Sequence, residues 1–302
     1  MTHPPTQNEI RALLADAGLR PDRRLGQNFL VDGNLMRLLV AEAELAPTDT
    51  VLEVGAGVGN LTDLLVEQAG WVVAVELDPR LADVARERLA DAANLDLLRT
   101  DALKDKHTLS PAMVERVLAR QRAVGGPLKL VANLPFAAAT PLVAELLVAG
   151  PVPERLVFTV QKEVADRLAA APATRDYGPV GVLVQALADV EVLRRLAPSV
   201  FWPRPRVRSA MVRILPSAER RNRIADLAAF RATLEGLFGH RRKQAARSLA
   251  LSPTLGGTPG HWAERLRAVG LDPAARGETY SVQDIIRLAN AIAAASDGPL
   301  LC

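Results

Sequence analysis

Short apolar runs alternate with amphipathic segments between residues 50 and 215. Six runs are nearly continuous in apolar character, which is typical of strands covered on both faces. These strand candidates are Thr50–Val54, Trp71–Glu76, Leu95–Leu98, Leu128–Ala132, Leu156–Val160 and Ala210–Leu215. Helical patterns lie between them at Leu61–Gln68, Leu81–Ala90, Pro141–Val148 and Gln161–Ala169. The alternation predicts an α/β fold with a doubly wound, Rossmann-like parallel sheet.

The rest of the chain has a different pattern. Val180–Val190 is ambiguous, and it fits a helix that leads into a strand at Asp189–Leu193. Beyond Pro216 only helical patterns occur, at Ile224–Phe238, Arg241–Leu249, Trp262–Val269 and Ser281–Ala293. We therefore expect two domains, a sheet domain over residues 1–215 and a small all-α domain over residues 216–302. A polar N-terminal tail runs into a short helix.

Length and composition indicate a globular protein with a large core and argue against a membrane protein or a disulfide-linked one. The chain has 302 residues and is 49% hydrophobic, enough for a substantial core. It has no run of 18 apolar residues and no apolar signal core at its N-terminus, so a membrane span is not expected. Its one cysteine, Cys302, excludes an internal disulfide framework and fits a reducing cytoplasm.

Charge is distributed unevenly along the chain. The formal net charge is +3, yet residues 201–250 contain 12 Lys and Arg against three acids and carry +9. The formal net charge of all the other residues together is therefore −6. Such asymmetry favours a polyanionic partner such as nucleic acid. An Arg-rich solvated surface explains the charge alone equally well.

A glycine loop follows the first predicted strand, in the sequence VLEVGAGVGNL from Val51 to Leu61. Gly55, Gly57 and Gly59 let the backbone pass close to a ligand without Cβ clashes. The spacing is G-x-G-x-G rather than the G-x-G-x-x-G of dinucleotide folds. By itself such a loop serves NAD, a flavin, S-adenosylmethionine or merely a tight turn.

Acidic residues at three successive strand ends narrow these choices. Glu53 precedes the first glycine, Glu76 ends the second predicted strand, and Asp101 follows the third. Ligands of open α/β sheets bind at this carboxyl edge. Glu76 could accept from both ribose hydroxyls and Asp101 from an adenine amine. S-adenosylmethionine carries a sulfonium cation and no phosphate, so an acidic site suits it better than NAD. Exposed acids that cap helices are the structural alternative.

The stretch VANLPFAAATPL, from Val131 to Leu142, follows the fourth predicted strand. The exocyclic amine of adenine is a poor nucleophile, because its lone pair is delocalised into the ring. The Asn133 side-chain oxygen and the Leu134 carbonyl could accept its two hydrogens and favour an attackable geometry. Pro135 fixes the turn and Phe136 offers a ring for stacking. Such a base must be flipped or single-stranded. The alternative is a simple turn with Phe136 in the core.

With these motifs together, the chain resembles the S-adenosylmethionine-dependent ribosomal RNA adenine dimethyltransferases, whose members dimethylate two adjacent adenines near the 3′ end of small-subunit rRNA. The resemblance covers most of the chain from about Leu25. It rests on LGQNFLVD (25–32), VLEVGAGVGNLT (51–62), VVAVELD (72–78), DAL (101–103), ANLPF (132–136), QKEVADRL (161–168), YGPVGVLVQ (177–185), VFWPRPRVRSAMVRI (200–214) and FGHRRKQAARSL (238–249).

The resemblance implies an rRNA (adenine-N6,N6)-dimethyltransferase with S-adenosyl-L-methionine as cofactor and no metal. Its partner would be 16S rRNA in the pre-30S subunit, and we expect a cytoplasmic monomer. The implied cofactor-binding residues are Asn28, Leu30, Gly55, Gly57, Glu76, Asp101 and Asn133. The implied catalytic residues are Asn133, Leu134, Pro135, Phe136 and Phe201. Phe201 would stack on the adenine opposite Phe136; alternatively, it packs to anchor its loop.

Basic residues supply the implied RNA contacts. Arg204, Arg206 and Arg208 follow Phe201 in a proline-rich loop. Arg241, Arg242, Lys243 and Arg247 lie in the segment FGHRRKQAARSL. We expect this segment to open a helix on which His240, Lys243 and Arg247 share a face. A solvated helix surface is the alternative.

Two departures from the family pattern stand out. Phe136 replaces the usual Tyr, which leaves stacking intact, and Ala137-Ala138-Ala139 replaces the usual Asn-Ile-Ser. The alanine run keeps open a non-catalytic ribosome-assembly factor that retains the fold. A related 23S rRNA adenine N6-methyltransferase and a DNA adenine methyltransferase are the rival enzymes. The basic segment argues against both, and NLPF argues against the DNA class.

Overall fold

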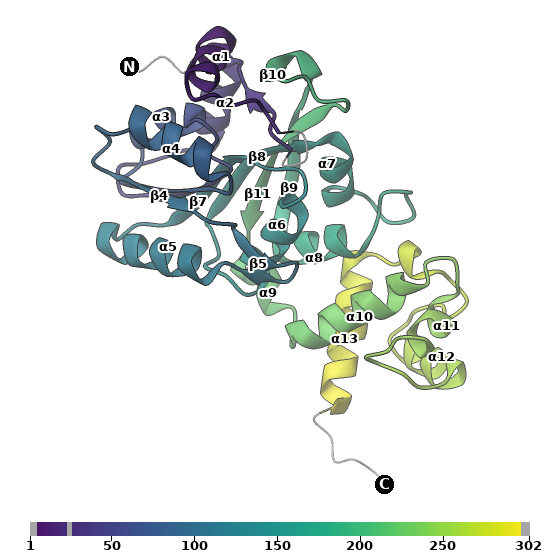
Figure 1. The fold of residues 1–302 in the computed structure, drawn as a ribbon. Helices are drawn as coiled ribbons and strands as arrows, with labels where there is room; N and C mark the ends of the chain where they lie inside the picture. The colour runs from purple at the N-terminus through teal and green to yellow at the C-terminus, as the bar shows by residue number, and fades with distance from the viewer. Residues whose placement is uncertain (1–4, 23–25, 297–302) are drawn as a thin grey trace. The chain divides into compact units, whose positions relative to one another are not determined.

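The computed structural model describes residues 5–22 and 26–296, so Leu25 and Cys302 lie outside the described residues. The chain forms two compact units, each drawn from separate stretches of sequence (Figure 1). Unit 1 contains the chain up to Ala165 together with Glu191–Pro216. Unit 2 contains Asp166–Val190 and the chain from Ser217 onward. One crossing between the units follows Pro216. The domains expected from the sequence are continuous and meet after residue 215, whereas each of these units combines two stretches of the chain.

The main sheet has seven strands in the order β4-β3-β2-β7-β8-β11-β9. The first five run parallel, and β11 pairs antiparallel with β8. The strand bounds are β2 Thr50–Val54, β3 Trp71–Glu76, β4 Leu95–Arg99, β7 Leu128–Asn133, β8 Arg155–Gln161, β9 Ala188–Leu196 and β11 Ser209–Pro216. All six predicted strands are present, and the ambiguous stretch forms a helix that leads into β9. The predicted α/β doubly wound sheet is therefore confirmed.

Apolar runs fill the sheet because helices cover both of its faces, as Figure 1 shows. Val51, Val72 and Val131 are completely buried. The helices of unit 1 are α1 Gln7–Asp16, α2 Gly33–Glu42, α3 Asn60–Val66, α4 Pro79–Arg88, α5 Pro111–Val124 and α6 Ala139–Val148. Sequence patterns did not predict α2 or α5. Helix α7, Lys162–Leu168, follows β8 directly.

The order of the strands determines where a ligand can bind. From β2 the chain moves outward to β3 and β4, and it then returns to β7 on the other side of β2. A crevice at the carboxyl ends is expected where the winding direction reverses, between β2 and β7. Two small antiparallel pairs complete unit 1: β1 Phe29–Leu30 with β10 Phe201–Trp202, and β5 Leu103–Asp105 with β6 Thr108–Leu109.

Unit 2 is helical. Its helices are α8 Pro179–Leu187, α9 Ala218–Asn222, α10 Leu227–Gly239, α11 Ala245–Ala250, α12 Pro259–Ala268 and α13 Val282–Ser296. Short 3₁₀ turns, η1 at Pro198–Val200 in unit 1 and η2 at Gly277–Thr279 in unit 2, complete the elements. Helix α8 belongs here because it packs on α10 and α13. Beside it Tyr177 is completely buried and donates to the Tyr280 carbonyl.

The basic segment of unit 2 differs from its prediction. Helix α10 ends at Gly239, and His240–Lys243 form a turn in which the Lys243 amide donates to the His240 carbonyl. Helix α11 begins only at Ala245. His240 and Lys243 therefore do not share a helical face with Arg247, and that expectation was wrong. Among the described helices, none is long and apolar enough to cross a membrane.

Candidate active site

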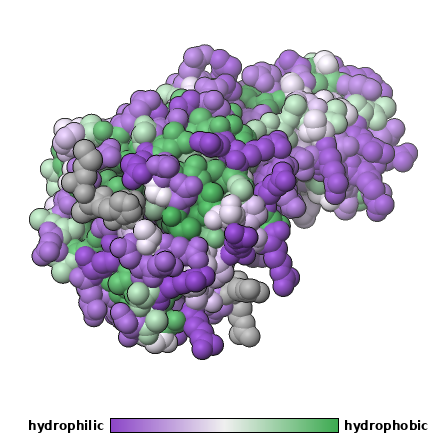
Figure 2. Space-filling view, turned by 90° about the horizontal axis from the view of Figure 1, so that it is seen from above, coloured by the Kyte–Doolittle hydropathy of each residue, from purple (hydrophilic) through white to green (hydrophobic). Residues whose placement is uncertain are grey.

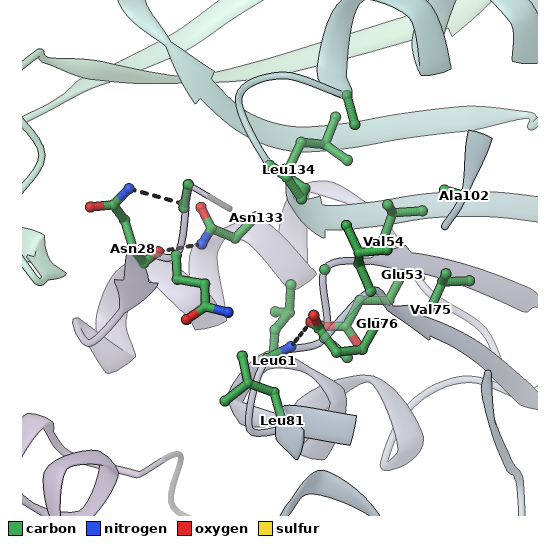
Figure 3. A pocket seen from close by; sticks show the side chains of 18 of the residues that line it. Asn28, Glu53, Val54, Leu61, Val75, Glu76, Leu81, Ala102, Asn133 and Leu134 are labelled. Atoms are coloured by element: carbon green, nitrogen blue, oxygen red, sulfur yellow. Dashed lines mark hydrogen bonds between the residues drawn. The ribbon is translucent and has the colours of Figure 1, made fainter. Parts of the chain in front are cut away.

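A cavity of about 290 Å³ opens at the carboxyl ends of the strands, at the reversal between β2 and β7. It is lined by the segment before β1, the glycine loop, and the residues that end β3, β4 and β7 (Figure 3). All seven predicted cofactor-binding residues line it, as do Leu134, Pro135 and Phe136. The lining residues include no Lys or Arg. On the face of unit 1 in Figure 2, apolar side chains gather within a hydrophilic rim.

The glycine loop is held in a conformation that only glycine adopts readily. Gly55 and Gly57 have φ of +86° and +60°. A Cβ on Gly55 would lie 3.0 Å from the Pro135 ring, and one on Gly57 would lie 3.0 Å from the Phe29 ring. The loop is therefore packed tightly between the Asn-Leu-Pro-Phe turn and the N-terminal segment.

Arg88, in the last turn of α4, fixes the far side of the loop. Its Nε donates to the Val58 carbonyl at 2.7 Å, and its guanidinium also bonds the Gly59 carbonyl and pairs with Asp63. Sequence reasoning missed Arg88, since it is about 30 residues from the loop and belongs to an ordinary amphipathic helix.

Glu76 closes the floor of the cavity. Its two carboxylate oxygens accept from the amides of Gly57, at 2.7 Å, and Asp78, at 2.8 Å. Burial raises the pKa of Glu76, and these amide hydrogen bonds partly offset the rise. Each oxygen keeps a further acceptor site, so the carboxylate can still receive two hydroxyls.

Glu53 lies beside Glu76 (Figure 3) and is 1% exposed. Burial raises the pKa of Glu53 to about 8, against the opposing hydrogen bond from Thr62 at 2.6 Å. Because both acids are buried in the cavity wall, a cation in the cavity would favour their charged forms.

Asp101 and Leu77 occupy the outer rim of the cavity. Asp101 is exposed, and one of its carboxylate oxygens accepts from the Leu103 amide at 3.0 Å. Leu77 is 51% exposed, which is unusual for a leucine beside a buried strand. Its side chain gives the rim an apolar surface beside Glu76, on which the flat face of an aromatic ligand could pack. Sequence reasoning missed Leu77, because one apolar residue after a strand carries no signal.

The N-terminal segment lies against the Asn-Leu-Pro-Phe turn. The Asn28 side chain donates to the Gly26 carbonyl, while the Asn28 carbonyl accepts from the Asn133 side chain at 2.9 Å (Figure 3). Leu30 is buried, lines the cavity, and accepts through its carbonyl from Asn60. The predicted placement of Asn28 and Leu30 beside the cavity therefore agrees with the structure.

Asn133 ends β7 with its amide fixed at both ends. Its nitrogen donates to Asn28, and its Oδ1 accepts from the Thr159 hydroxyl at 2.5 Å. Thr159 is buried in β8, the neighbouring parallel strand, with its position set by the Asn133–Thr159 register. Oδ1 retains a second lone pair for a substrate. Thr159 is a positioning residue that the run LVFTV did not reveal.

The residues after Asn133 form the predicted turn. The Leu134 amide donates to the Thr159 carbonyl, and the Pro135 carbonyl accepts from the amides of Ala138 and Ala139. Phe136 is half-buried at the cavity and does not belong to the core. Helix α6 then starts without any side-chain cap, since Ala138 occupies the position. Backbone hydrogen bonds and the burial of Ala139 hold the alanine run.

Phe201 does not face the cavity, so the prediction of a second stacking wall is contradicted by this structure. Phe201 is 2% exposed and packs in the core with Leu30 and Met36. Its pairing with Leu30 in the β1–β10 ladder turns it inward, and the next residue, Trp202, points the other way. The alternative of a loop-anchoring aromatic fits Phe201.

The predicted RNA-binding cations all lie at the surface, in two groups. Arg204, Arg206 and Arg208 are exposed in the loop between β10 and β11 of unit 1. Arg241, Arg242, Lys243 and Arg247 are exposed in unit 2. Arg241 is engaged, since it pairs with Glu278 and donates to the Thr174 carbonyl at 3.0 Å. It ties two segments of unit 2 together.

Comparison with known proteins gives a consistent result. Residues 19–293 match the family model described as ribosomal RNA adenine dimethylase. Ribosomal RNA small subunit methyltransferase A of Halothermothrix orenii is 36% identical over 289 residues, covering 95% of this chain and 93% of the relative. The protein of the same name from Nocardia farcinica is 38% identical over 294 residues, covering 93% of each.

Solved structures share the fold. A dimethyladenosine transferase from Plasmodium falciparum superposes with a TM-score of 0.69 at 20% identity, covering 85% of this chain and 94% of that one. The 23S rRNA methyltransferase ErmE superposes with a TM-score of 0.61 at 25% identity, covering 88% of this chain and all of that one.

Proposed function

The chain belongs to the ribosomal RNA adenine dimethylase family, and from this we propose that it methylates N6 of two adjacent adenines near the 3′ end of 16S rRNA. The observation that carries the proposal is the Asn133 amide, fixed between Asn28 and Thr159 at the edge of the cavity. An amide held in this way presents a preorganised acceptor to an exocyclic amine.

S-adenosyl-L-methionine is the proposed methyl donor. Its sulfonium supplies the electrophilic methyl group. The residues present fit it, because the cavity has two buried acids and an exposed one in its lining and no cation for a pyrophosphate. Glu76 would accept from the ribose, Asp101 from the adenine amine, and Leu77 would pack on the ring. The Gly55–Gly57 backbone would approach the cofactor without a side chain between them.

Catalysis would then depend on orientation rather than on a covalent intermediate. Asn133 Oδ1 and the Leu134 carbonyl would accept the N6 hydrogens and aim the nitrogen lone pair into the cavity. Phe136 would stack on the base from one side. Because Phe201 lies in the core, Phe136 alone would stack on the base.

The proposed substrate is 16S rRNA within the pre-30S subunit, and the names of the relatives, which specify small-subunit ribosomal RNA, support the choice of rRNA. We assign methyl transfer to unit 1 and RNA binding to the exposed cations of unit 2 and the β10–β11 loop. Methyl transfer to 23S rRNA is the second candidate, supported by the similarity to ErmE. The lower identity to ErmE than to the small-subunit relatives favours 16S rRNA.

The deciding experiment measures transfer of labelled methyl groups to three substrates: under-methylated small subunits, naked 16S rRNA and 23S rRNA. Nucleoside analysis then identifies the product. Dimethyladenosine in the small subunit supports the proposal. Label in 23S rRNA selects the second candidate. No transfer to any substrate, with normal binding to the subunit, indicates an assembly factor that has lost turnover.

A further inference from the structure

A second hollow in unit 1, of about 590 Å³, lies between α1 and β10. Its walls are one side of α1, the turn that follows α1, and one indole. The lining residues are Arg11, Leu14, Ala15, Gly18, Leu19, Arg20, Pro21 and Trp202. We call this hollow the Trp202 groove. None of the residues assigned to the cofactor or to the target base belongs to it.

The groove is cationic and partly apolar. Two of its eight lining residues are arginines and none is acidic, although Asp16 and Asp22 lie in the same segment. Arg11 and Arg20 are both exposed. Within the described part of the chain, Arg20 has no ion-pair partner, and the Arg11 guanidinium lies 5.1 Å from the Trp202 ring centroid.

Trp202 connects the groove to the cofactor loop. Its ring stacks on Phe29 with centroids 6.3 Å apart and planes 23° apart, and Phe29 in turn packs on Gly57. Trp202 is half-buried, so part of the indole remains accessible. Arg204, another exposed cation, follows two residues later. The groove is thus one aromatic ring away from the loop that borders the cavity.

We propose that the Trp202 groove holds a nucleotide of the substrate RNA that flanks the target adenine. The base would pack against the Arg11–Trp202 pair, in which the guanidinium already lies over the indole, and Arg20 would hold its phosphate. This inference rests on the proposed function. Aromatic faces and Arg guanidinium planes are the surfaces on which unstacked RNA bases pack, and neighbouring cations follow the backbone. A flipped adenine leaves its neighbours unstacked, so a nearby stacking surface offsets part of the cost of flipping.

The test uses full-length protein with under-methylated small subunits. Trp202→Ala and Arg20→Glu should each raise the KM for the subunit, Trp202→Ala by roughly tenfold, as expected for the loss of one stacked base. Arg20→Glu should change neither kcat nor the affinity for S-adenosylmethionine by more than about twofold, whereas Trp202→Ala also removes the ring that packs on Phe29 beside Gly57. Trp202→Phe, which keeps a ring, should restore most of the KM. Arg20→Glu avoids the packing loss that Trp202→Ala causes beside Phe29.

Arg122→Glu is the matched control, because Arg122 is also an exposed arginine and lies at the end of α5, away from α1 (Figure 1). The groove is disproved as an RNA site if Arg20→Glu and Trp202→Ala behave like this control. Photo-crosslinking to thiouridine-substituted subunits adds a second measurement. Crosslinks between the groove and rRNA support the proposal, whereas crosslinks only to a ribosomal protein contradict it.

The two proposals can fail separately. If the wild-type protein methylates small subunits and the groove variants match the control, the groove is wrong and the function stands. If no methyl transfer occurs on any substrate, the function fails, and the crosslinking map alone decides whether the groove contacts RNA.

Discussion

The cavity of unit 1 buries two acidic side chains, whereas the basic turn of unit 2, His240–Lys243, exposes its basic side chains to solvent. In the cavity, Glu53 and Glu76 are buried and hydrogen-bonded. In the turn, Arg242 and Lys243 are exposed, and the structure shows no partner for their side chains among the described residues. Much of the unit 2 surface in Figure 2 is hydrophilic. A small cationic ligand is best stabilised by negative groups fixed at one point. A long polyanion such as RNA is best attracted by positive charges spread over a solvated surface.

Asn133→Ala should give the largest effect and would show how strongly the cavity depends on fixed groups. Loss of one preorganised acceptor should lower kcat by about 10²–10³-fold, roughly 3–4 kcal/mol. Methyl transfer to small subunits measures it. RNA affinity, read by filter binding, should stay unchanged because Asn133 carries no charge and the basic turn is left intact. Normal turnover by the variant would rule out the proposed role of Asn133.

Glu53→Gln tests whether ionisation of the buried Glu53 lowers the free energy of unfolding as the pH rises. The pKa of Glu53 is raised in the folded protein, so the folded state binds more protons than the unfolded state between about pH 4.5 and 8. Its stabilising contribution is therefore complete below pH 4.5 and is lost as pH rises to about 8. The variant should remove this decline, which has an upper bound of roughly 5 kcal/mol. Denaturant unfolding of the cofactor-free protein across this range measures it. Parallel curves for the two proteins would contradict the prediction.

Glu76→Ala should weaken cofactor binding by about 2 kcal/mol, roughly 30-fold, because two amides lose their acceptor and the ribose loses its partner. Calorimetry with S-adenosylmethionine gives the affinity. Glu76→Gln, which keeps one acceptor oxygen, serves as the control and should lose less. An unchanged affinity in both variants would remove Glu76 from the site.

Thr159→Val should cost about 1 kcal/mol in kcat, because the Asn133 amide loses the hydroxyl that orients it. The KM for cofactor should change little, since Thr159 does not line the cavity. Thr159→Ser restores the hydroxyl and should recover turnover. A purely structural role for Thr159 would instead lower stability in Thr159→Val without this rescue of kcat.

Arg242→Glu combined with Lys243→Glu should have the smallest effect, a several-fold loss of affinity for the small subunit. The slope of log affinity against log salt should shrink by about 0.7–0.9 for each phosphate that the variant no longer neutralises. Arg241→Ala sharpens the comparison, because that residue is paired within unit 2 and should lower stability more than RNA affinity. An unchanged salt slope would show that the turn does not bind phosphate.

Sequence patterns predicted the sheet well because its strands are buried on both faces and therefore read as apolar runs. They missed α2, which begins close after a two-residue strand. They also missed α5, in which many exposed polar residues weaken the helical repeat of apolar positions. They also extended α11 toward the N-terminus through Arg241–Lys243, which belong to a turn, and through Gln244, which is its N-cap. Helix ends depend on local caps and turns, which leave weaker traces than a buried strand does.

The candidate site was predictable where side chains follow strand ends directly. Glu76, Asp101 and Asn133 reach one cavity because parallel strands place their carboxyl ends along one edge. Arg88 and Thr159 were not predictable, since each acts through a contact set by tertiary packing. Phe201 shows the limit of a motif: its position is right, yet the two-residue pairing with β1 turns its ring into the core.

The discontinuous make-up of unit 2 has a consequence for synthesis of the chain. Helix α8 is apolar and packs on α10 and α13, but α13 begins roughly 95 residues after α8 ends. At about 5–20 residues per second, translation would leave α8 without its last partner for on the order of 5–20 seconds. During that interval part of the apolar surface of α8 is exposed on the nascent chain, even after α10 has been made. Chaperone binding to α8 is therefore expected to affect the yield of folded protein.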